Sequence, residues 1–178
     1  MNKKTVLAVF AVIFLSAGIH PVIADTPAPN VESLTLSPNG QFSIRMVPDE
    51  GWGGYGPGEG IVFEKSAPVD REIWKVNFYS SEVILADDGR HLIAFGPWAM
   101  DMTDLAVSFY EEGRLLKEYR VLDLIDPDKV QRTVSHLFWK EADNVSASRL
   151  SEDQKTFTVR MIDGTERVFD VATGELTG

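Results

Sequence analysis

The sequence contains no cysteine and only three histidines among its 178 residues. The absence of cysteine excludes disulfide bonds, cysteine zinc sites and the lipid anchor of bacterial lipoproteins. Only two histidines, His91 and His136, lie beyond residue 24, where the signal peptide predicted below would end, and two are too few for a histidine zinc site. Ser135 precedes His136, but neighbouring side chains on a strand point to opposite faces, so we discount this pair as a nucleophile and base. We therefore expect no catalytic residues, no metal and no cofactor.

Basic residues are also scarce, since 17 Lys and Arg stand against 27 Asp and Glu and give a formal net charge of −10. A chain of this charge is repelled by nucleic acid and by anionic lipid. We therefore do not expect nucleic acid as a partner.

The chain has one long apolar run, at residues 5–15, and it follows the basic start Asn2-Lys3-Lys4. This pattern predicts a signal peptide at residues 1–24, with a cut after Ala17 or a retained N-terminal anchor as the alternatives. Residues 25–30 are then a flexible mature N-terminus, and residues 31–178 form one domain. We expect a periplasmic or secreted protein with no membrane span after cleavage.

Three phrases of turn residues recur between runs of β-formers, at residues 37–42, 87–92 and 151–157. Asn39-Gly40 and Asp88-Gly89 accept the positive φ of tight hairpin turns, so each phrase predicts two antiparallel strands joined by a short connection. Residues 42–46, 74–78, 105–109 and 157–161 alternate between apolar and polar side chains, as half-buried strands do.

The remaining segments complete the expected fold. Residues 92–95 are apolar throughout, which predicts a central strand covered on both faces. One short helix is expected near residues 121–131, where Asp126 can cap and Pro127 can take the first helical position. Residues 134–139 return to strand character, and about ten strands fit the chain. We predict an all-β fold of short antiparallel hairpins in two or three small packed sheets.

Residues 168–175 form a strand that ends in Asp170 and enters a Thr173-Gly174 turn, and residues 87–92 place an Asp-Gly turn before an apolar strand. Both resemble segments of β-propeller repeats of the WD40 and quinoprotein-like types, and the resemblance covers residues 31–46, 82–122 and 147–176. It implies propeller-type blades. A closed propeller needs roughly 4 to 8 blades, so the resemblance implies a propeller-like open arc rather than a closed ring. An open arc exposes sheet edges that oligomerisation would cover. Propellers host unrelated activities, so the resemblance assigns no function.

Two segments are candidates for binding. Residues 51–60 contain six glycines with Trp52 and Tyr55, which could close over a sugar or peptide, or could belong to a linker whose aromatics tuck onto the core. In residues 95–104 the chain leaves a strand through Gly-Pro and presents Trp98 and Met100, which would either form an adaptable apolar patch or cover the rim of the core. The predicted ligand-binding residues are therefore Trp52, Tyr55, Trp98 and Met100.

Acidic residues cluster at three places, and none of the clusters matches a calcium loop. Ordinary turn chemistry explains each of them, so no metal is expected. The clusters are Asp87 with Asp88, Asp101 with Asp104, and Asp123 with Asp126 and Asp128.

These features favour a secreted or periplasmic binding or protein-interaction module without enzymatic activity, whose partner is a protein, peptide or glycan of the cell envelope. Two alternatives remain open. One is a small envelope-directed hydrolase with an Asp or Glu acid-base pair, which would need a cleft with carboxylates about 5 to 9.5 Å apart. The other is a structural or assembly factor that adds strands at exposed sheet edges.

Overall fold

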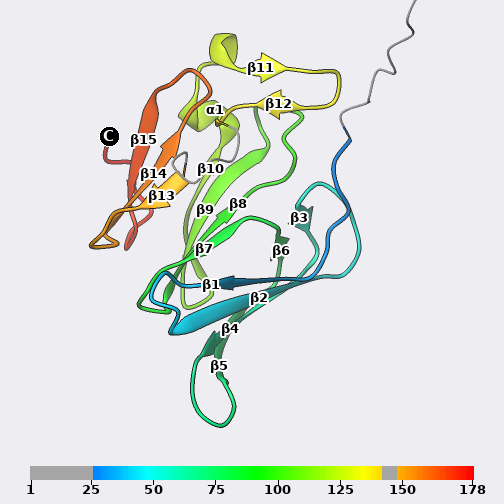
Figure 1. Cartoon of the computed structure of the whole chain (residues 1–178). Helices are drawn as coiled ribbons and strands as arrows, with labels where there is room; N and C mark the ends of the chain where they lie inside the picture. The colour runs from blue at the N-terminus through cyan, green and yellow to red at the C-terminus, as the bar shows by residue number, and fades with distance from the viewer. Residues whose placement is uncertain (1–25, 142–147) are drawn as a thin grey trace, which may run out of the picture.

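A computed structural model describes residues 26–141 and 148–178 of the chain. Within these residues three antiparallel sheets follow one another along the sequence, and each is a meander in which consecutive long strands are neighbours (Figure 1). The prediction of an all-β fold built from small antiparallel sheets is confirmed, and the described strands form no closed barrel. The predicted signal peptide lies outside the described residues.

The first sheet has the strand order β1-β2-β4-β5, the second β10-β9-β8-β7 and the third β13-β14-β15. Two small two-stranded sheets, β3-β6 and β11-β12, complete the described part. The strands of the first sheet and its hairpins are β1 Ser33–Leu36, β2 Phe42–Pro48, β3 Tyr55–Gly56, β4 Gly58–Glu64, β5 Arg71–Val76 and β6 Tyr79–Ser80. Those that follow are β7 Val83–Leu85, β8 His91–Phe95, β9 Leu105–Glu111, β10 Arg114–Arg120, β11 Gln131–Arg132, β12 Leu137–Phe138, β13 Ser148–Leu150, β14 Thr156–Arg160 and β15 Glu166–Asp170.

Strand β8 lies between the two hydrophobic cores of the molecule. Its Leu92 and Ala94 pack with the first sheet, while its Ile93 and Phe95 pack with the third sheet. This arrangement explains why residues 92–95 are apolar throughout, and it confirms the prediction of a strand covered on both faces.

The three turn phrases have the same local geometry. The residues at the equivalent turn position, Gly40, Gly89 and Gln154, all have a positive φ, of 67°, 66° and 57°. In each turn the N–H of this residue donates to the carbonyl three residues earlier, at 2.8, 3.0 and 2.9 Å respectively. Each turn joins two antiparallel strands, so the three predicted hairpins are confirmed.

Asp87 links the three turns to one another. Its carboxylate accepts from the backbone N–H of Asn39 at 2.6 Å and from the side-chain amide of Gln154. Its own N–H donates to the side-chain carbonyl of Gln154 at 2.7 Å. The first, second and third sheets are therefore held together at this end by one side chain.

The predicted helical segment contains a short helix, α1 Val121–Leu124, and a 3-10 turn at Pro127–Lys129. Asp126 accepts from the N–H of Asp128 at 3.0 Å and Pro127 takes the first position, so the predicted start signal is confirmed. Val121 and Leu124 are buried in the core between the second and third sheets.

Other boundaries differ from the sequence prediction. The described residues contain fifteen strands rather than about ten, in part because two pairs, β3-β6 and β11-β12, consist of strands only two residues long. The strand predicted at residues 74–78 ends at Val76, since the chain bends there to pair Tyr79 and Ser80 with Tyr55 and Gly56. Of the predicted strand at residues 134–139, only Leu137–Phe138 is a strand. No described helix has the length and apolar character needed to cross a bilayer.

Candidate functional site

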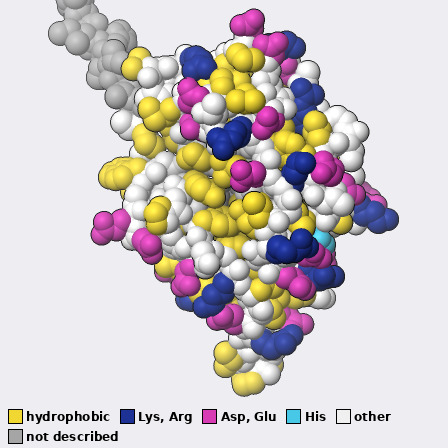
Figure 2. Space-filling model, turned by 180° about the vertical axis from the view of Figure 1, so that it is seen from behind, with side chains coloured by type: hydrophobic (Ala, Val, Ile, Leu, Met, Phe, Trp, Pro, Cys, Tyr) yellow, Lys and Arg dark blue, Asp and Glu magenta, His cyan; other side chains and the backbone are white. Residues whose placement is uncertain are grey.

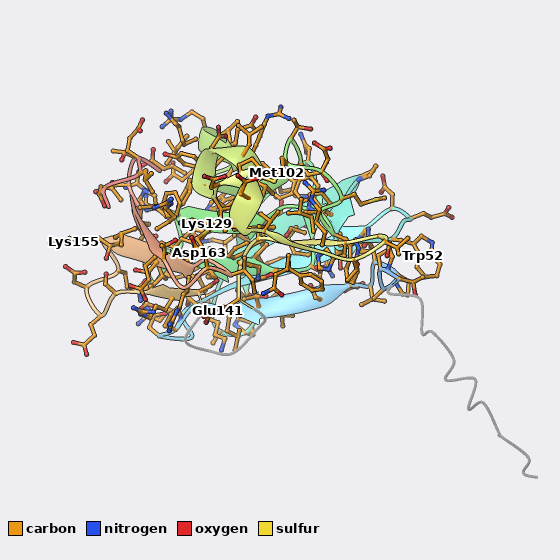
Figure 3. All side chains as sticks on the ribbon, turned by 90° about the horizontal axis from the view of Figure 1, so that it is seen from above. Trp52, Met102, Lys129, Glu141, Lys155 and Asp163 are labelled. Carbon is orange, nitrogen blue, oxygen red and sulfur yellow. The ribbon has the colours of Figure 1, made fainter. Side chains whose placement is uncertain are left out.

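The four predicted binding residues do not form one cluster. Trp52 and Met100 are the most exposed of them, with 67% and 65% of their surfaces accessible. Trp52 lies at one end of the molecule, opposite the end at which Lys155 lies (Figure 3). It pairs with Pro29 through an isolated antiparallel bridge, so its backbone is fixed while its side chain projects.

Tyr55 belongs to a different group of rings. Its ring stacks on Phe78 at 5.5 Å, and Phe78 in turn contacts Tyr110 at 5.0 Å. Burial, followed by the neighbouring Tyr110, raises the pKa of Tyr55 to about 12. Tyr55 therefore packs onto the sheets, as the linker alternative for residues 51–60 describes.

Trp98 is held rigidly by two segments that are distant in sequence. Its backbone N–H donates to the carbonyl of Gly53 at 2.6 Å, which joins it to the glycine-rich loop. Its indole Nε1–H donates to the carbonyl of Ser135 at 2.8 Å, and its ring stacks on His136 with centroids 3.8 Å apart. The loop and Trp98 are thus brought together through the loop backbone.

Trp98 lines a cavity of about 480 Å³, which we call the Trp98 cavity. Its walls come from the segment before β1, the glycine-rich loop, the end of β8 and the β11-β12 hairpin. This volume falls within the usual range for sites that hold a small ligand or a short segment of a larger one. The side chains that give the cavity its character are Pro29, Phe95, Trp98, His136, Phe138, Trp139, Glu82 and Lys140.

One ion pair is set into these apolar walls. The Lys140 ammonium lies 2.8 and 2.9 Å from the two carboxylate oxygens of Glu82. The same ammonium lies 4.5 Å from the centre of the Phe95 ring, within the range of a cation–π contact. A fixed polar group among aromatic walls can orient a ligand whose remaining surface is apolar.

The wall formed by the β11-β12 hairpin contains none of the predicted binding residues. His136, Phe138 and Lys140 occur at alternate positions, and this period of two is the sequence signal that could have placed them on one face of the wall. Ser135 and His136 lie in the turn before β12 rather than on the predicted strand. Ser135 contributes its carbonyl to Trp98.

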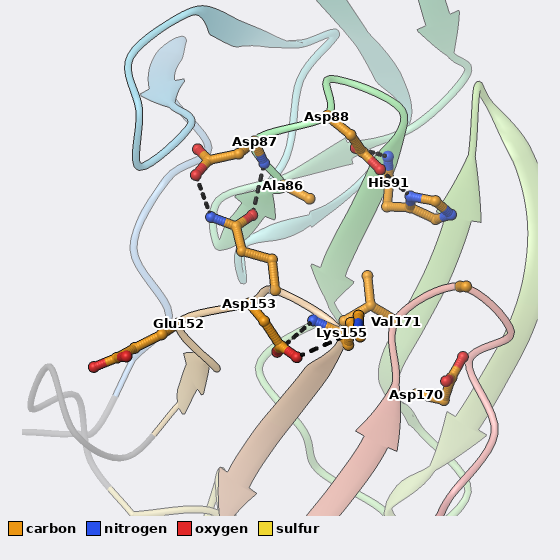
Figure 4. A pocket seen from close by; sticks show the side chains of 11 residues that line it. Ala86, Asp87, Asp88, His91, Glu152, Asp153, Lys155, Asp170 and Val171 are labelled. Carbon is orange, nitrogen blue, oxygen red and sulfur yellow. Dashed lines mark hydrogen bonds and ion pairs between the residues drawn. The ribbon is translucent and has the colours of Figure 1, made fainter.

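A second cavity, of about 680 Å³, lies where the second and third turn phrases meet (Figure 4). Four of its five lining carboxylates, those of Asp87, Asp88, Asp153 and Asp170, accept hydrogen bonds in or between the turns. Asp153 accepts from the hydroxyl of Ser151 at 2.7 Å and from the N–H of Lys155 at 3.2 Å. Burial acts to raise the pKa of Asp88, but hydrogen bonds from the N–H of Arg90 and from the ring and N–H of His91 outweigh it, and the pKa is lowered. A carboxyl with a lowered pKa is poorly suited to act as a general acid.

The carboxylates of the other two acidic clusters also accept hydrogen bonds from nearby backbone N–H groups. Asp104 accepts from the N–H of Met100 at 2.7 Å, and Asp123 accepts from the N–H of Arg120 at 2.8 Å. Within residues 26–141 and 148–178, no group of three or more histidine or acidic side chains is placed to hold a metal ion.

Comparison with known proteins finds no family model that matches this chain and no curated protein that is similar to it.

Proposed function

We propose that this protein is an exported binding module, without enzymatic activity of its own, that holds a ring-bearing segment of an envelope peptide or glycan in the Trp98 cavity. The observation that carries the proposal is the rigid aromatic wall, in which Trp98 is fixed by Gly53, Ser135 and His136. Flat aromatic walls suit sugar rings and the apolar side chains of peptides.

The wall needs little rearrangement before it can bind. The indole Nε1–H of Trp98 is already used by a backbone carbonyl, so the ring offers apolar surface rather than a hydrogen bond. Binding to walls that are already ordered costs less conformational entropy than binding to walls that must first become ordered. Trp52 is the sequence neighbour of Gly53, which lines the cavity, and its side chain is exposed, so we propose that it adds apolar surface for the ligand.

The charge of the molecule supports a neutral or cationic ligand. The formal net charge is −10, and acidic and basic side chains are interspersed over the face shown in Figure 2. Glu82 and Lys140 neutralise each other within the cavity wall. The Trp98 cavity therefore selects by shape and apolar contact more than by charge.

The proposal that the protein is exported rests on the basic start and apolar run of residues 1–15, which are typical of a signal peptide. Mass determination of the protein isolated from cells that express the full coding sequence tests this part. Loss of residues 1–24 and recovery from the envelope fraction are expected. An intact N-terminus in the cytosolic fraction would refute export.

The binding proposal is tested by capture from envelope extract with the purified protein, followed by mass spectrometry of the bound peptides and glycans. The variant Trp98→Ala removes the wall and should lose the captured ligand. Trp74→Ala is the matched control, because the Trp74 Nε1–H also donates to a backbone carbonyl, that of Gly89 at 2.8 Å, but does not line the cavity.

A second variant keeps the proposal testable if Trp98→Ala fails to fold. Trp52→Ala truncates an exposed side chain and should keep the fold, while weakening capture by severalfold. If Trp98→Ala is folded and captures the same ligands as the parent, the cavity is not the site. Release of cleaved glycan or peptide by the parent would instead favour the hydrolase alternative. Among the described lining residues Glu82 is the single carboxylate, so that alternative gains no support from this cavity.

A further inference from the structure

The outer strands of the three sheets are protected unequally against pairing with another chain. Three of the edges carry charged side chains, which disfavour the addition of a further strand. β5 and β10 are in addition bent by register shifts. The charged residues are Arg71, Glu72 and Lys75 on β5, Arg114, Lys117, Glu118 and Arg120 on β10, and Arg149 on β13.

Two further edges are covered by other parts of the chain. The C-terminal residues lie along β15, where Thr177 N–H donates to the carbonyl of Val168 at 2.7 Å and Asp170 N–H donates to the carbonyl of Glu175 at 2.9 Å. On β7, Val83 and Leu85 are buried against the first sheet.

Within the part of the chain that the structure describes, β1 has neither charged side chains nor a further segment hydrogen-bonded along its outer edge. Residues 33–36 carry no charge, and the strand presents Leu34 and Leu36 outwards, with 63% and 51% of their surfaces accessible. Its polar residues, Ser33 and Thr35, face the opposite way and are partly buried. This is the reverse of the usual orientation of a surface strand, and it marks β1 as a strand whose outer face is suited to a partner.

The backbone of β1 is also prepared for pairing. Ser37 N–H donates to the carbonyl of Phe42 at 3.0 Å, so Ser37 and Phe42 form a hydrogen-bonded pair of the β1-β2 ladder. Because such pairs alternate with non-bonded ones, the N–H and C=O groups of Leu34 and Leu36 point away from β2. The start of the strand is fixed by Tyr79, whose hydroxyl donates to the carbonyl of Val31 at 2.8 Å.

We infer that β1 pairs antiparallel with β1 of a second copy of this chain, with Leu34 opposite Leu36 of the partner subunit. The strand is complementary to itself in this register, because the outward backbone groups of residues 34 and 36 meet those of the partner as hydrogen-bonded pairs. The four leucines then form one cluster on the outer face. Thr35 lies opposite Thr35 of the partner subunit on the other face, a pairing that stabilises antiparallel sheets.

The pairing is isologous and closes after two subunits, which predicts a dimer rather than a fibre. In this register Glu32 lies opposite Pro38 of the partner subunit, so no like charges meet across the new ladder. Each chain has a formal net charge of −10, and this long-range repulsion is screened by salt. The dimer should therefore become tighter as the salt concentration rises.

The experiment measures the mass of the protein, expressed from the full coding sequence, by analytical ultracentrifugation over a series of concentrations. A concentration-dependent dimer is expected. Leu34→Lys should raise the dimer dissociation constant by about tenfold or more, because the new charge is present twice at the centre of the interface. The matched control is Leu115→Lys, since Leu115 is 46% accessible and lies on the charged edge strand β10.

Amide hydrogen exchange supplies a second readout that does not depend on a variant. In the dimer the N–H groups of Leu34 and Leu36 should be protected, and dilution should remove this protection. A monomer at all concentrations, or a dimer that Leu34→Lys leaves unchanged, would overturn the inference. Protection of these amides only in the presence of an envelope protein would likewise overturn it and favour the strand-adding assembly factor. The inference is independent of the Trp98 cavity, so Leu34→Lys should leave ligand capture unchanged.

Discussion

The substitution Gly89→Ala tests how the first two sheets meet at the turn phrases. Gly89 has a φ of 66°, and a methyl group placed there would lie 2.7 Å from Cγ of Phe42. Positive φ costs a residue with a side chain about 1–2 kcal/mol. Displacing the Phe42 ring from its packed position adds about 1–3 kcal/mol, as over-packing does. We therefore expect Gly89→Ala to lower the free energy of unfolding by about 2–5 kcal/mol.

Gly40→Ala is the matched control for this prediction. Gly40 occupies the same turn position with a φ of 67°, but a methyl group there would meet no atom within 4 Å. Its cost should be the conformational one alone, about 1–2 kcal/mol. Urea unfolding followed by tryptophan fluorescence measures both variants. Equal destabilisation by the two substitutions would refute the packing of Phe42 against the Gly89 turn.

Two further predictions follow from the bonds of Asp87 and from the burial of Tyr55. Asp87→Ala removes the acceptor shared by Asn39 and Gln154, so it should cost about 1–3 kcal/mol of unfolding free energy, and a double-mutant cycle with Gln154→Ala should be non-additive. Additive losses in urea unfolding would show that Asp87 does not join the turns. The raised pKa of Tyr55, about 12 against an ordinary 10.0, favours the neutral form in the folded protein, so its contribution to stability is complete below pH 10.0 and is lost as the pH rises through about 12. Tyr55→Phe should reduce the alkaline loss of stability in this window, and an unchanged pH profile would contradict the assignment.

Local features of the sequence were sufficient for most of the longer strands and for the three turn phrases. Residues 92–95 are apolar at every position because β8 serves two cores, and this pattern is visible without any knowledge of its neighbours. The three turn phrases were likewise recognisable, although Gln154 adopts the positive φ without being glycine or asparagine. Its side-chain bonds to Asp87 offset that cost, and Asp87 lies 67 positions away in sequence.

The candidate site could be predicted only in part. Trp98 was identified from its position after a central strand, but the carbonyl that fixes its indole belongs to Ser135, 37 positions away. The hydrogen bonds that fix Trp98 use backbone groups of Gly53 and Ser135, which every residue type possesses, so no side-chain pattern marks them. Tyr55 could not be separated from Trp52 by sequence, because the bend that turns it towards Phe78 depends on the pairing of β3 with β6.

The most direct test of the binding proposal is a crystallographic soak of the protein with a set of small sugars and aromatic amino-acid derivatives. We predict that these probes gather in the Trp98 cavity, against the ring of Trp98 and beside the Lys140–Glu82 ion pair. Probes bound at the turn cavity around Asp87 and Asp153, with the Trp98 cavity left empty, would contradict it.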